Sequence, residues 1–175
     1  MSADQFQIIH INELVDKEKA DSSSYRAIFD CGKASLNDYL QKYARKNSEQ
    51  EIGQTWVLWH EESKSVAGYY TLLTTSVERQ ETQIKAPYPI ISAIKIGRLA
   101  VSLKFQRQGI GIRLLLSSFS DILEIADRVG VTLILVDAID EEAKRFYLKN
   151  DFTAFRDNDT ALFMKVEYAR KLNLK

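Results

Sequence analysis

The stretch Leu99–Leu116, LAVSLKFQRQGIGIRLLL, joins an apolar strand to an amphipathic helix through the turn at residues 106–111. Gly109 and Gly111 stand where the helix is expected to begin. Because neither residue carries a Cβ atom, successive backbone N–H groups can converge on an anion there, and the positive end of the helix dipole adds to the attraction. The turn therefore predicts a binding site for a diphosphate group.

Two other phosphate-binding motifs do not match this turn. The dinucleotide fingerprint GxGxxG needs a third glycine, and Leu114 stands at that position. The ATP-binding P-loop ends in Gly-Lys-Ser/Thr, which is absent here. Hydride transfer and phosphoryl transfer are thus disfavoured, while a glycine turn with no ligand remains the plain alternative.

The composition is that of a globular protein, with 45% hydrophobic and 27% charged residues among 175. This length predicts a single domain over residues 1–175 and excludes disordered and collagen-like classes. The 24 basic and 24 acidic residues cancel. The balance gives no global attraction to nucleic acid, although a local basic patch is compatible with it.

Cysteine and histidine are too few for a disulfide scaffold or a metal site. Cys31 has no second cysteine, and His10 and His60 are isolated in apolar runs, so we expect a half-buried thiol in a turn and no metal. We find no pattern of a signal peptide or a membrane-spanning segment. These features predict a cytoplasmic protein that does not contact a membrane.

Apolar periodicity and turn residues predict the order of the elements. We expect strands at 6–11, 54–59, 65–77, 94–101, 131–138, 152–155 and 161–166, helices at 35–46, 111–130 and 140–149, and polar loops at 16–24 and 78–89. Ser35 and Asp140 are the expected helix N-caps, and Gly68 is an expected bulge. The strand–helix–strand segment at 94–138 predicts a right-handed crossover between parallel strands of a mixed α/β (α+β) sheet.

Two motifs at this separation resemble the GNAT superfamily of N-acetyltransferases. The first is QRQGIG at 106–111, and the second is VDAIDEEAKRFY at 136–147, followed by Asn150-Asp151-Phe152. The resemblance implies the GNAT fold, in which helices flank a mixed central sheet. It also implies that acetyl-CoA is the co-substrate.

By this resemblance, the backbone at Leu99, Ala100 and Val101 pairs with the pantetheine arm of acetyl-CoA. The pyrophosphate is held by Gln106, Arg107, Gln108, Gly109, Ile110 and Gly111, and Asp140 and Ala143 contribute to the cofactor site. Tyr147 is the expected general acid, because a phenol of pKa about 10 keeps its proton at neutral pH and can donate it to the departing thiolate. The alternative is that Tyr147 is a buried aromatic residue with a satisfied hydroxyl. We name no general base.

Within the superfamily, FDCG at 29–32, SLNDYL at 35–40 and GRLAV at 97–101 resemble the toxins of toxin–antitoxin pairs. Those toxins acetylate the amino group of aminoacyl-tRNA and are neutralised by ribbon-helix-helix antitoxins. The resemblance therefore implies tRNA and such an antitoxin as partners, with a homodimer left open. The candidate RNA contacts are Lys33, Lys42, Arg45, Lys46 and Arg98, for which a solvated face is the alternative.

The sequence departs from that branch in its neutral charge, in Asp140 where relatives carry asparagine, and in Asp151 where they carry glycine. Aspartate can adopt the left-handed conformation that this turn requires. Two other functions stay open. The chain could acetylate a small-molecule or peptide amine, or it could be a catalytically silent module that binds acyl-CoA.

Overall fold

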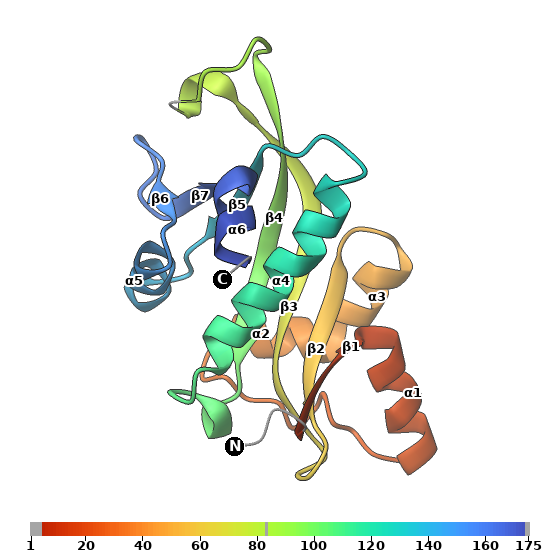
Figure 1. Ribbon diagram of the computed structural model, residues 1–175. Helices are drawn as coiled ribbons and strands as arrows, with labels where there is room; N and C mark the ends of the chain where they lie inside the picture. Colours follow the sequence, from red (N-terminus) through yellow and green to blue (C-terminus); the bar gives the residue numbers. More distant parts are fainter. Residues whose placement is uncertain (1–4, 83, 174–175) are drawn as a thin grey trace. The chain divides into compact units, whose positions relative to one another are not determined.

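The computed structural model describes residues 5–82 and 84–173. Figure 1 shows its elements, which follow the order β1 (Phe6–His10), α1 (Ile11–Asp21), α2 (Ala34–Asp38), η2 (Tyr39–Tyr43), α3 (Ala44–Glu49), β2 (Gln54–His60), β3 (Ser65–Glu78), η3 (Arg79–Glu81), β4 (Ile90–Val101), η4 (Leu103–Phe105), α4 (Ile110–Ala126), β5 (Leu133–Asp137), α5 (Glu141–Lys149), β6 (Thr153–Ala154), β7 (Ala161–Lys165) and α6 (Val166–Asn173).

The strands of the described residues form one mixed sheet in the order β1-β2-β3-β4-β5-β7-β6. β4 and β5 are parallel, with Ile94 opposite Ile134. β5 is antiparallel to β7, and β2 is antiparallel to both β1 and β3. The parallel pair requires a crossover, and α4 supplies it. The predicted α/β fold with a mixed sheet and a parallel crossover is confirmed.

The chain divides into two compact units. The N-terminal unit comprises Met1–Leu72 and Arg98–Leu115, and the C-terminal unit comprises Leu73–Gly97 and Leu116–Lys175. β3, β4 and α4 each continue from one unit into the other. The single domain expected over residues 1–175 stays a prediction.

Helix α1 contradicts the expected loop at 16–24. His10 caps the helix through Nδ1, which accepts the backbone N–H of Asn12, while the Glu13 side chain accepts the backbone N–H of His10. Ile11, Leu14 and Val15 are buried on one face. The loop prediction was wrong because the charged residues at 16–21 form the last turns of a helix. The apolar face of this helix begins before residue 16 in the chain.

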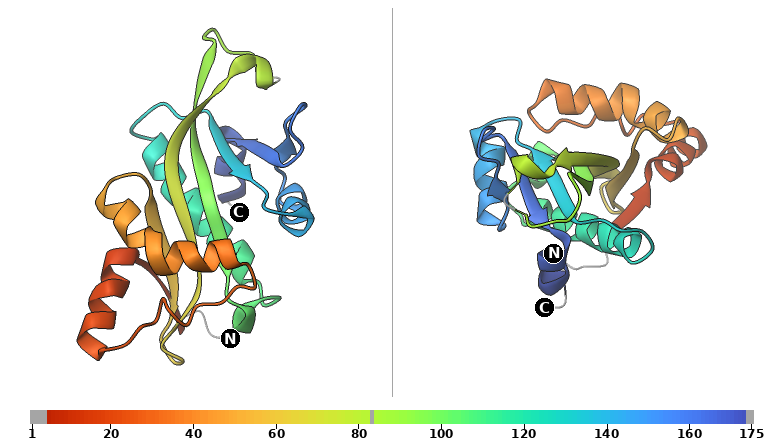
Figure 2. Two further views of the ribbon diagram at one scale, coloured as in Figure 1. Left: turned by 180° about the vertical axis from the view of Figure 1, so that it is seen from behind. Right: turned by 90° about the horizontal axis from the view of Figure 1, so that it is seen from above.

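The second helical segment is continuous through α2, η2 and α3, and it is drawn in orange in Figure 2. Its N-cap is Lys33 in an extended conformation, so the expected N-cap at Ser35 was wrong. The chain turns earlier, at Gly32 with φ of +81°. In η2 the helix widens to π geometry, which is uncommon and often accompanies functional sites.

The β2–β3 hairpin contains the expected irregularity near Gly68. Leu58 is opposite Gly68 while Trp59 is opposite Val66, so Ala67 is the extra residue of a bulge. A Cβ atom at Gly68 would lie 2.6 Å from the carbonyl oxygen of Ala100 and 2.7 Å from Cδ1 of Leu114. Glycine is therefore required for the close approach of β3 to the end of β4.

In the C-terminal unit, β5 is buried at Leu133–Val136, as a strand covered on both faces should be. Asp140 caps α5 as predicted, because its Oδ1 accepts the backbone N–H of Ala143 at 2.8 Å. Asp151 has φ of +64°, which confirms the expected left-handed turn.

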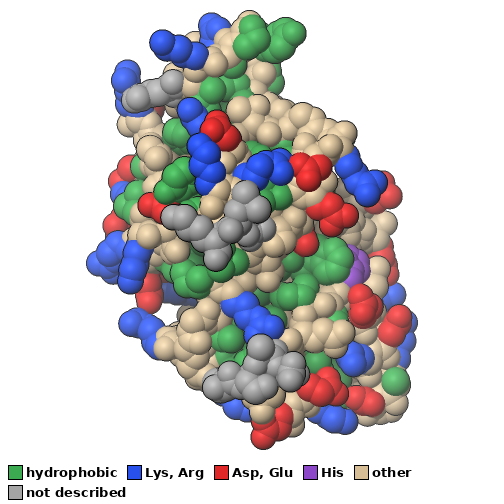
Figure 3. All heavy atoms as spheres, in the orientation of Figure 1, with side chains coloured by type: hydrophobic (Ala, Val, Ile, Leu, Met, Phe, Trp, Pro, Cys, Tyr) green, Lys and Arg blue, Asp and Glu red, His purple; other side chains and the backbone are tan. Residues whose placement is uncertain are grey.

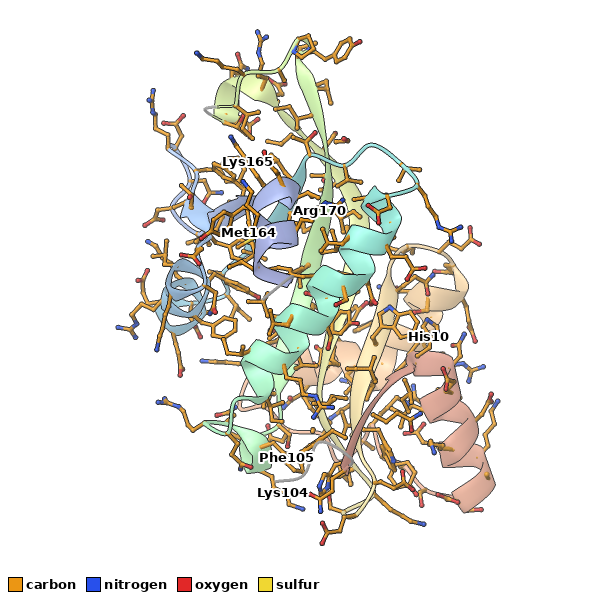
Figure 4. All side chains as sticks on the ribbon, viewed as in Figure 1. His10, Lys104, Phe105, Met164, Lys165 and Arg170 are labelled. Carbon is orange, nitrogen blue, oxygen red and sulfur yellow. The ribbon has the colours of Figure 1, made fainter. Side chains whose placement is uncertain are left out.

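The sequence did not predict α6. It follows β7 directly, and its Arg170, labelled in Figure 4, forms a 2.8 Å ion pair with Asp127. β4 begins at Ile90, earlier than the expected 94. The segment that joins β3 to β4 carries exposed hydrophobic and basic side chains, which lie at the top in Figure 3.

Candidate active site

The glycine turn lies in the N-terminal unit, between the end of β4 and the start of α4. η4 follows β4, and residues 106–109 form the turn before α4 begins at Ile110. Figure 4 labels Lys104 and Phe105 on η4. The strand, turn and helix predicted at Leu99–Leu116 are therefore present.

Two hydrogen bonds from one side chain hold the turn. The Gln106 amide Nε2 donates to the carbonyl oxygens of Cys31 at 3.1 Å and Val101 at 3.0 Å. A backbone bond of 2.8 Å from Leu103 N–H to the Asp30 carbonyl ties η4 to the same loop. The side chain of Gln106 thus fixes the turn to the loop at 30–32, a contact that the sequence did not indicate.

The base of the turn is packed by aromatic rings. Phe105 is 4% exposed, and its ring centroid lies 5.8 Å from that of Phe6 and 5.1 Å from that of His60. From the first turns of α4, Arg113 donates to the Phe6 carbonyl at 3.0 Å. These contacts anchor both sides of the turn to β1 and β2.

The turn presents backbone to solvent where it enters α4. Gly109 has φ of +80°, and among the described residues other than its two chain neighbours no heavy atom lies within 4 Å of the position a Cβ would take. Arg107 also has a positive φ, of 62°. The first N–H groups of a helix have no intrahelical partner, so the start of α4 offers donors and a positive dipole end to an anion.

Cys31 has the environment of a structural thiol. It is 6% exposed, and its Sγ donates to Oδ1 of Asn37 at 3.1 Å. Burial, the largest cause, raises the pKa of the thiol. A thiol that stays protonated is a poor nucleophile, and Cys31 is more deeply buried than the half-buried thiol expected from the sequence.

The C-terminal unit holds Asp140, Ala143 and Tyr147 on α5. The Asp140 side chain caps the helix. Tyr147 is 6% exposed, and its ring centroid lies 5.4 Å from that of Phe152 and 5.3 Å from that of Phe146. Burial and, secondarily, the charge of Asp137 raise the pKa of Tyr147 far above its ordinary value. The phenol is thus protonated at neutral pH.

The Tyr147 hydroxyl forms no hydrogen bond within residues 5–82 and 84–173. In the same residues, every side-chain nitrogen or oxygen that is sealed from solvent has a partner. The hydroxyl oxygen therefore retains access to solvent, which an acid catalyst needs and a satisfied core tyrosine does not.

The predicted RNA-contacting residues differ in their partners. Lys42 is paired with Asp38 at 2.6 Å, and Arg45 is paired with Glu49 at 2.7 Å. The Arg98 guanidinium lies 3.9 Å from the Tyr39 ring centroid and, like Lys46, has no carboxylate partner in the described part of the chain. Lys33 is exposed. Arg98 and Lys46 are thus the better available cations of this set.

The predicted residues fall into two groups. Residues 98–111, with Lys33, Lys42, Arg45 and Lys46, belong to the N-terminal unit, and Asp140, Ala143 and Tyr147 belong to the C-terminal unit. Among the described residues, no cluster of three or more His, Cys, Asp or Glu side chains could hold a metal ion. No helix within them is long and apolar enough to cross a membrane.

Sequence comparison finds an acetyltransferase (GNAT) domain at residues 51–154. A tRNA-acetylating toxin of Mycobacterium tuberculosis (strain ATCC 25618 / H37Rv) is 33% identical over 150 residues, which cover 82% of this chain and 87% of the toxin.

Structure comparison finds the same fold in KacT and in the toxin AtaT. A tyrosine-to-phenylalanine mutant of KacT has a TM-score of 0.84 at 28% identity, over 96% of this chain and 99% of KacT. AtaT complexed with acetyl-methionyl-tRNAfMet has a TM-score of 0.82 at 26% identity, over 95% and 98% of the two chains. AtaTR bound with acetyl-CoA has a TM-score of 0.80 at 26% identity, over 97% and 98%.

Proposed function

Because the chain belongs to the GNAT acetyltransferase family, we propose that it transfers the acetyl group of acetyl-CoA to the α-amino group of an aminoacyl-tRNA. The observation that carries this proposal is the 33% identity, over 82% of the chain, to a tRNA-acetylating toxin. The similarity to AtaT, which was solved with an acetylated aminoacyl-tRNA, supports the same acceptor.

The glycine turn fits the diphosphate of acetyl-CoA. The open space at Gly109 lets the ligand approach the backbone, and the segment 102–112 contains no acidic residue but includes Lys104 and Arg107. The N–H groups at the start of α4 would hold the pyrophosphate, and the backbone of Leu99 and Val101 would pair with the pantetheine amides. The carbonyl of Val101 already accepts the Gln106 amide, and the proposal assigns the pantetheine contact at Val101 to its N–H.

Tyr147 would supply the proton of the reaction. Bound acetyl-CoA provides an acetyl thioester, which a neutral amine attacks. As the new C–N bond forms, the C–S bond breaks and the amine nitrogen releases one proton to solvent. Tyr147 holds its proton at neutral pH, would donate it from the hydroxyl to the sulfur that leaves, and would regain a proton from solvent. An α-amine with a pKa of about 8 loses its own proton far more easily than a lysine at about 10.4, so an aminoacyl group is the easier acceptor.

As a member of the toxin branch, the protein would act in the cytoplasm, where charged tRNA is found, and would be neutralised by an antitoxin. The similarity to the toxins KacT and AtaT supports this assignment. A second candidate, acetylation of a small-molecule or peptide amine, is favoured by the zero net charge of the chain.

The test is to incubate the protein with aminoacyl-tRNAs and acetyl-CoA labelled in the acetyl group. We expect label on the α-amine of at least one aminoacyl-tRNA, identified after the ester is hydrolysed. Tyr147→Phe serves as the matched control for enzymatic transfer. Label on polyamines or peptides, with none on any aminoacyl-tRNA, would establish the second candidate instead.

A further inference from the structure

A cavity of about 530 Å³ lies entirely within the C-terminal unit. Its lining comes from the distal part of β3, from η3, from β4, from the end of β5, from the segment that joins β6 to β7 and from the start of β7. Val77, Leu135 and Phe155 give it an apolar wall. The volume is within the range of small-ligand sites.

The charged part of the lining is mostly acidic. It includes the carboxylates of Glu78, Glu81, Asp137 and Asp157, against the single ammonium group of Lys95. Lys95 is paired with Asp137. Glu81 and Asp157 have no ion-pair partner in residues 5–82 and 84–173, so their charges are not neutralised there.

Such a lining distinguishes the phosphodiester backbone of an aminoacyl-tRNA from its aminoacyl group. Phosphodiesters are repelled by unpaired carboxylates, whereas the α-ammonium group, together with any cationic side chain, is attracted. The aminoacyl end is therefore the part of this substrate that the cavity suits.

One lining residue, Asp137, lies just before the proposed catalytic helix in the chain. Asp137 lines the cavity at the carboxyl end of β5, and Asp140, three residues later, caps α5. The charge of Asp137 is felt at Tyr147, whose pKa it helps to raise. Tyr147 is itself more than nine-tenths buried, with a hydroxyl that has no partner in the described residues.

We propose that this cavity receives the aminoacyl group of the acceptor, with the side chain against Val77, Leu135 and Phe155, and that Glu81 and Asp157 make it reject acidic side chains. The inference rests on the proposed function and goes beyond it by naming the class of aminoacyl group. Neutral and cationic side chains are accepted, and aspartyl and glutamyl groups are not.

The test compares glutaminyl and glutamyl groups, which differ little in size but differ in charge. Both are placed on one tRNA with an acylating ribozyme, so that the RNA is identical. We expect the wild-type kcat/KM for the glutamyl group to be about ten-fold lower than for the glutaminyl group. Because the carboxylates are exposed, the ratio should move toward one at high salt.

Reversing the charge of the lining residues then tests whether the cavity causes the preference for the glutaminyl group. Asp157→Lys and Glu81→Lys should each raise the glutamyl-to-glutaminyl ratio about five-fold. Glu124→Lys, at an exposed site on α4 outside the lining, is the matched control and should leave the ratio unchanged. Thermal unfolding of each variant reports whether the fold is intact, and the ratio itself is insensitive to a loss of folded protein.

A wild-type ratio near one, or cavity variants that behave like Glu124→Lys, would overturn the inference while the proposed function stands. If the wild-type protein acetylates no aminoacyl-tRNA, whatever its side chain, the proposed function fails and the inference fails with it.

Discussion

The glycine turn and helix α5 are built in opposite ways. The turn exposes its backbone at Gly109, which has a positive φ and open space around its Cβ position. The buried ring of Phe105 and the side-chain amide of Gln106 hold the turn in place. On α5, the backbone is ordinary helix and the feature that matters is one buried phenol among aromatic rings. Under the proposed function, the contrast means that main-chain shape would serve cofactor binding, whereas a single side-chain atom would serve the chemical step.

The largest effect should follow from removing that atom. Tyr147→Phe keeps the ring contacts with Phe146 and Phe152 and deletes only the hydroxyl. We expect kcat to fall by about 100-fold or more, while the Kd for acetyl-CoA is unchanged, because general acid catalysis contributes on this scale. Steady-state kinetics and calorimetry measure the two quantities, and an unchanged kcat would remove Tyr147 from the mechanism.

A change to the backbone of the turn should affect binding instead. Gly109→Val places a β-branched residue at φ of +80°, a conformation that L-residues rarely adopt. We expect the Kd for acetyl-CoA to rise about ten-fold, as the strained turn draws its N–H groups away from the pyrophosphate.

Gly130→Val is the control for this prediction. Gly130 also has open space around its Cβ position but lacks a positive φ, so this variant should bind acetyl-CoA like the wild type. Equal weakening by both substitutions would argue against a special role for the turn.

The two hydrogen bonds of the Gln106 side chain should contribute to the stability of the folded protein. Gln106→Ala deletes the hydrogen bonds to the carbonyls of Cys31 and Val101. We expect the free energy of unfolding to fall by about 1–2 kcal/mol, measured by urea denaturation. Gln108→Ala, which loses one exposed bond to the Lys104 carbonyl, should cost clearly less. The reverse order would show that the bridge to the 30–32 loop is unimportant.

A smaller effect is expected at the basic surface of the N-terminal unit. Lys46→Ala removes a cation that has no ion pair in the described residues, whereas Lys42→Ala removes one already paired with Asp38. If Lys46 contacts one phosphate, its removal should reduce the slope of log Kobs for tRNA binding against log salt concentration by about one. Filter binding across salt concentrations separates the two variants, and identical slopes would place neither lysine on the RNA.

The smallest expected effect concerns pH. Tyr147 acts in its protonated form, and burial raises its pKa, so it stays protonated at pH values where an ordinary tyrosine begins to ionise. The kcat profile should therefore show no alkaline decline up to about pH 9. A decline near neutral pH that disappears in Tyr147→Phe would contradict the buried, protonated phenol.

The parts of this molecule that the sequence predicts are those with a local cause. Gly109 marks a turn by its missing Cβ, and Asp140 marks a helix start by its side-chain oxygen, and both lie where expected. Helix α1 was missed because its last turns are charged, although the apolar stripe of Ile11, Leu14 and Val15 was a readable signal.

The features that were not predicted depend on residues far apart in the chain. Gln106 reaches Cys31 across 75 positions, and the cavity gathers residues between Thr75 and Ala161. Residue spacing and apolar periodicity in the sequence do not indicate contacts between residues so far apart in the chain. The side chain of Gln106 braces the turn, and the place of this residue in the pyrophosphate site stays a prediction.

The division of labour between the turn and the phenol is tested most directly with four proteins: wild type, Tyr147→Phe, Gly109→Val and the double variant. For each, the acetyl-CoA Kd and the single-turnover rate at saturating acetyl-CoA are measured with a charged tRNA. We predict that the tyrosine change lowers only the rate, that the glycine change raises only the Kd, and that the double variant shows both effects undiminished. A rate that falls equally in both single variants, or a Kd that rises in Tyr147→Phe, would contradict the account.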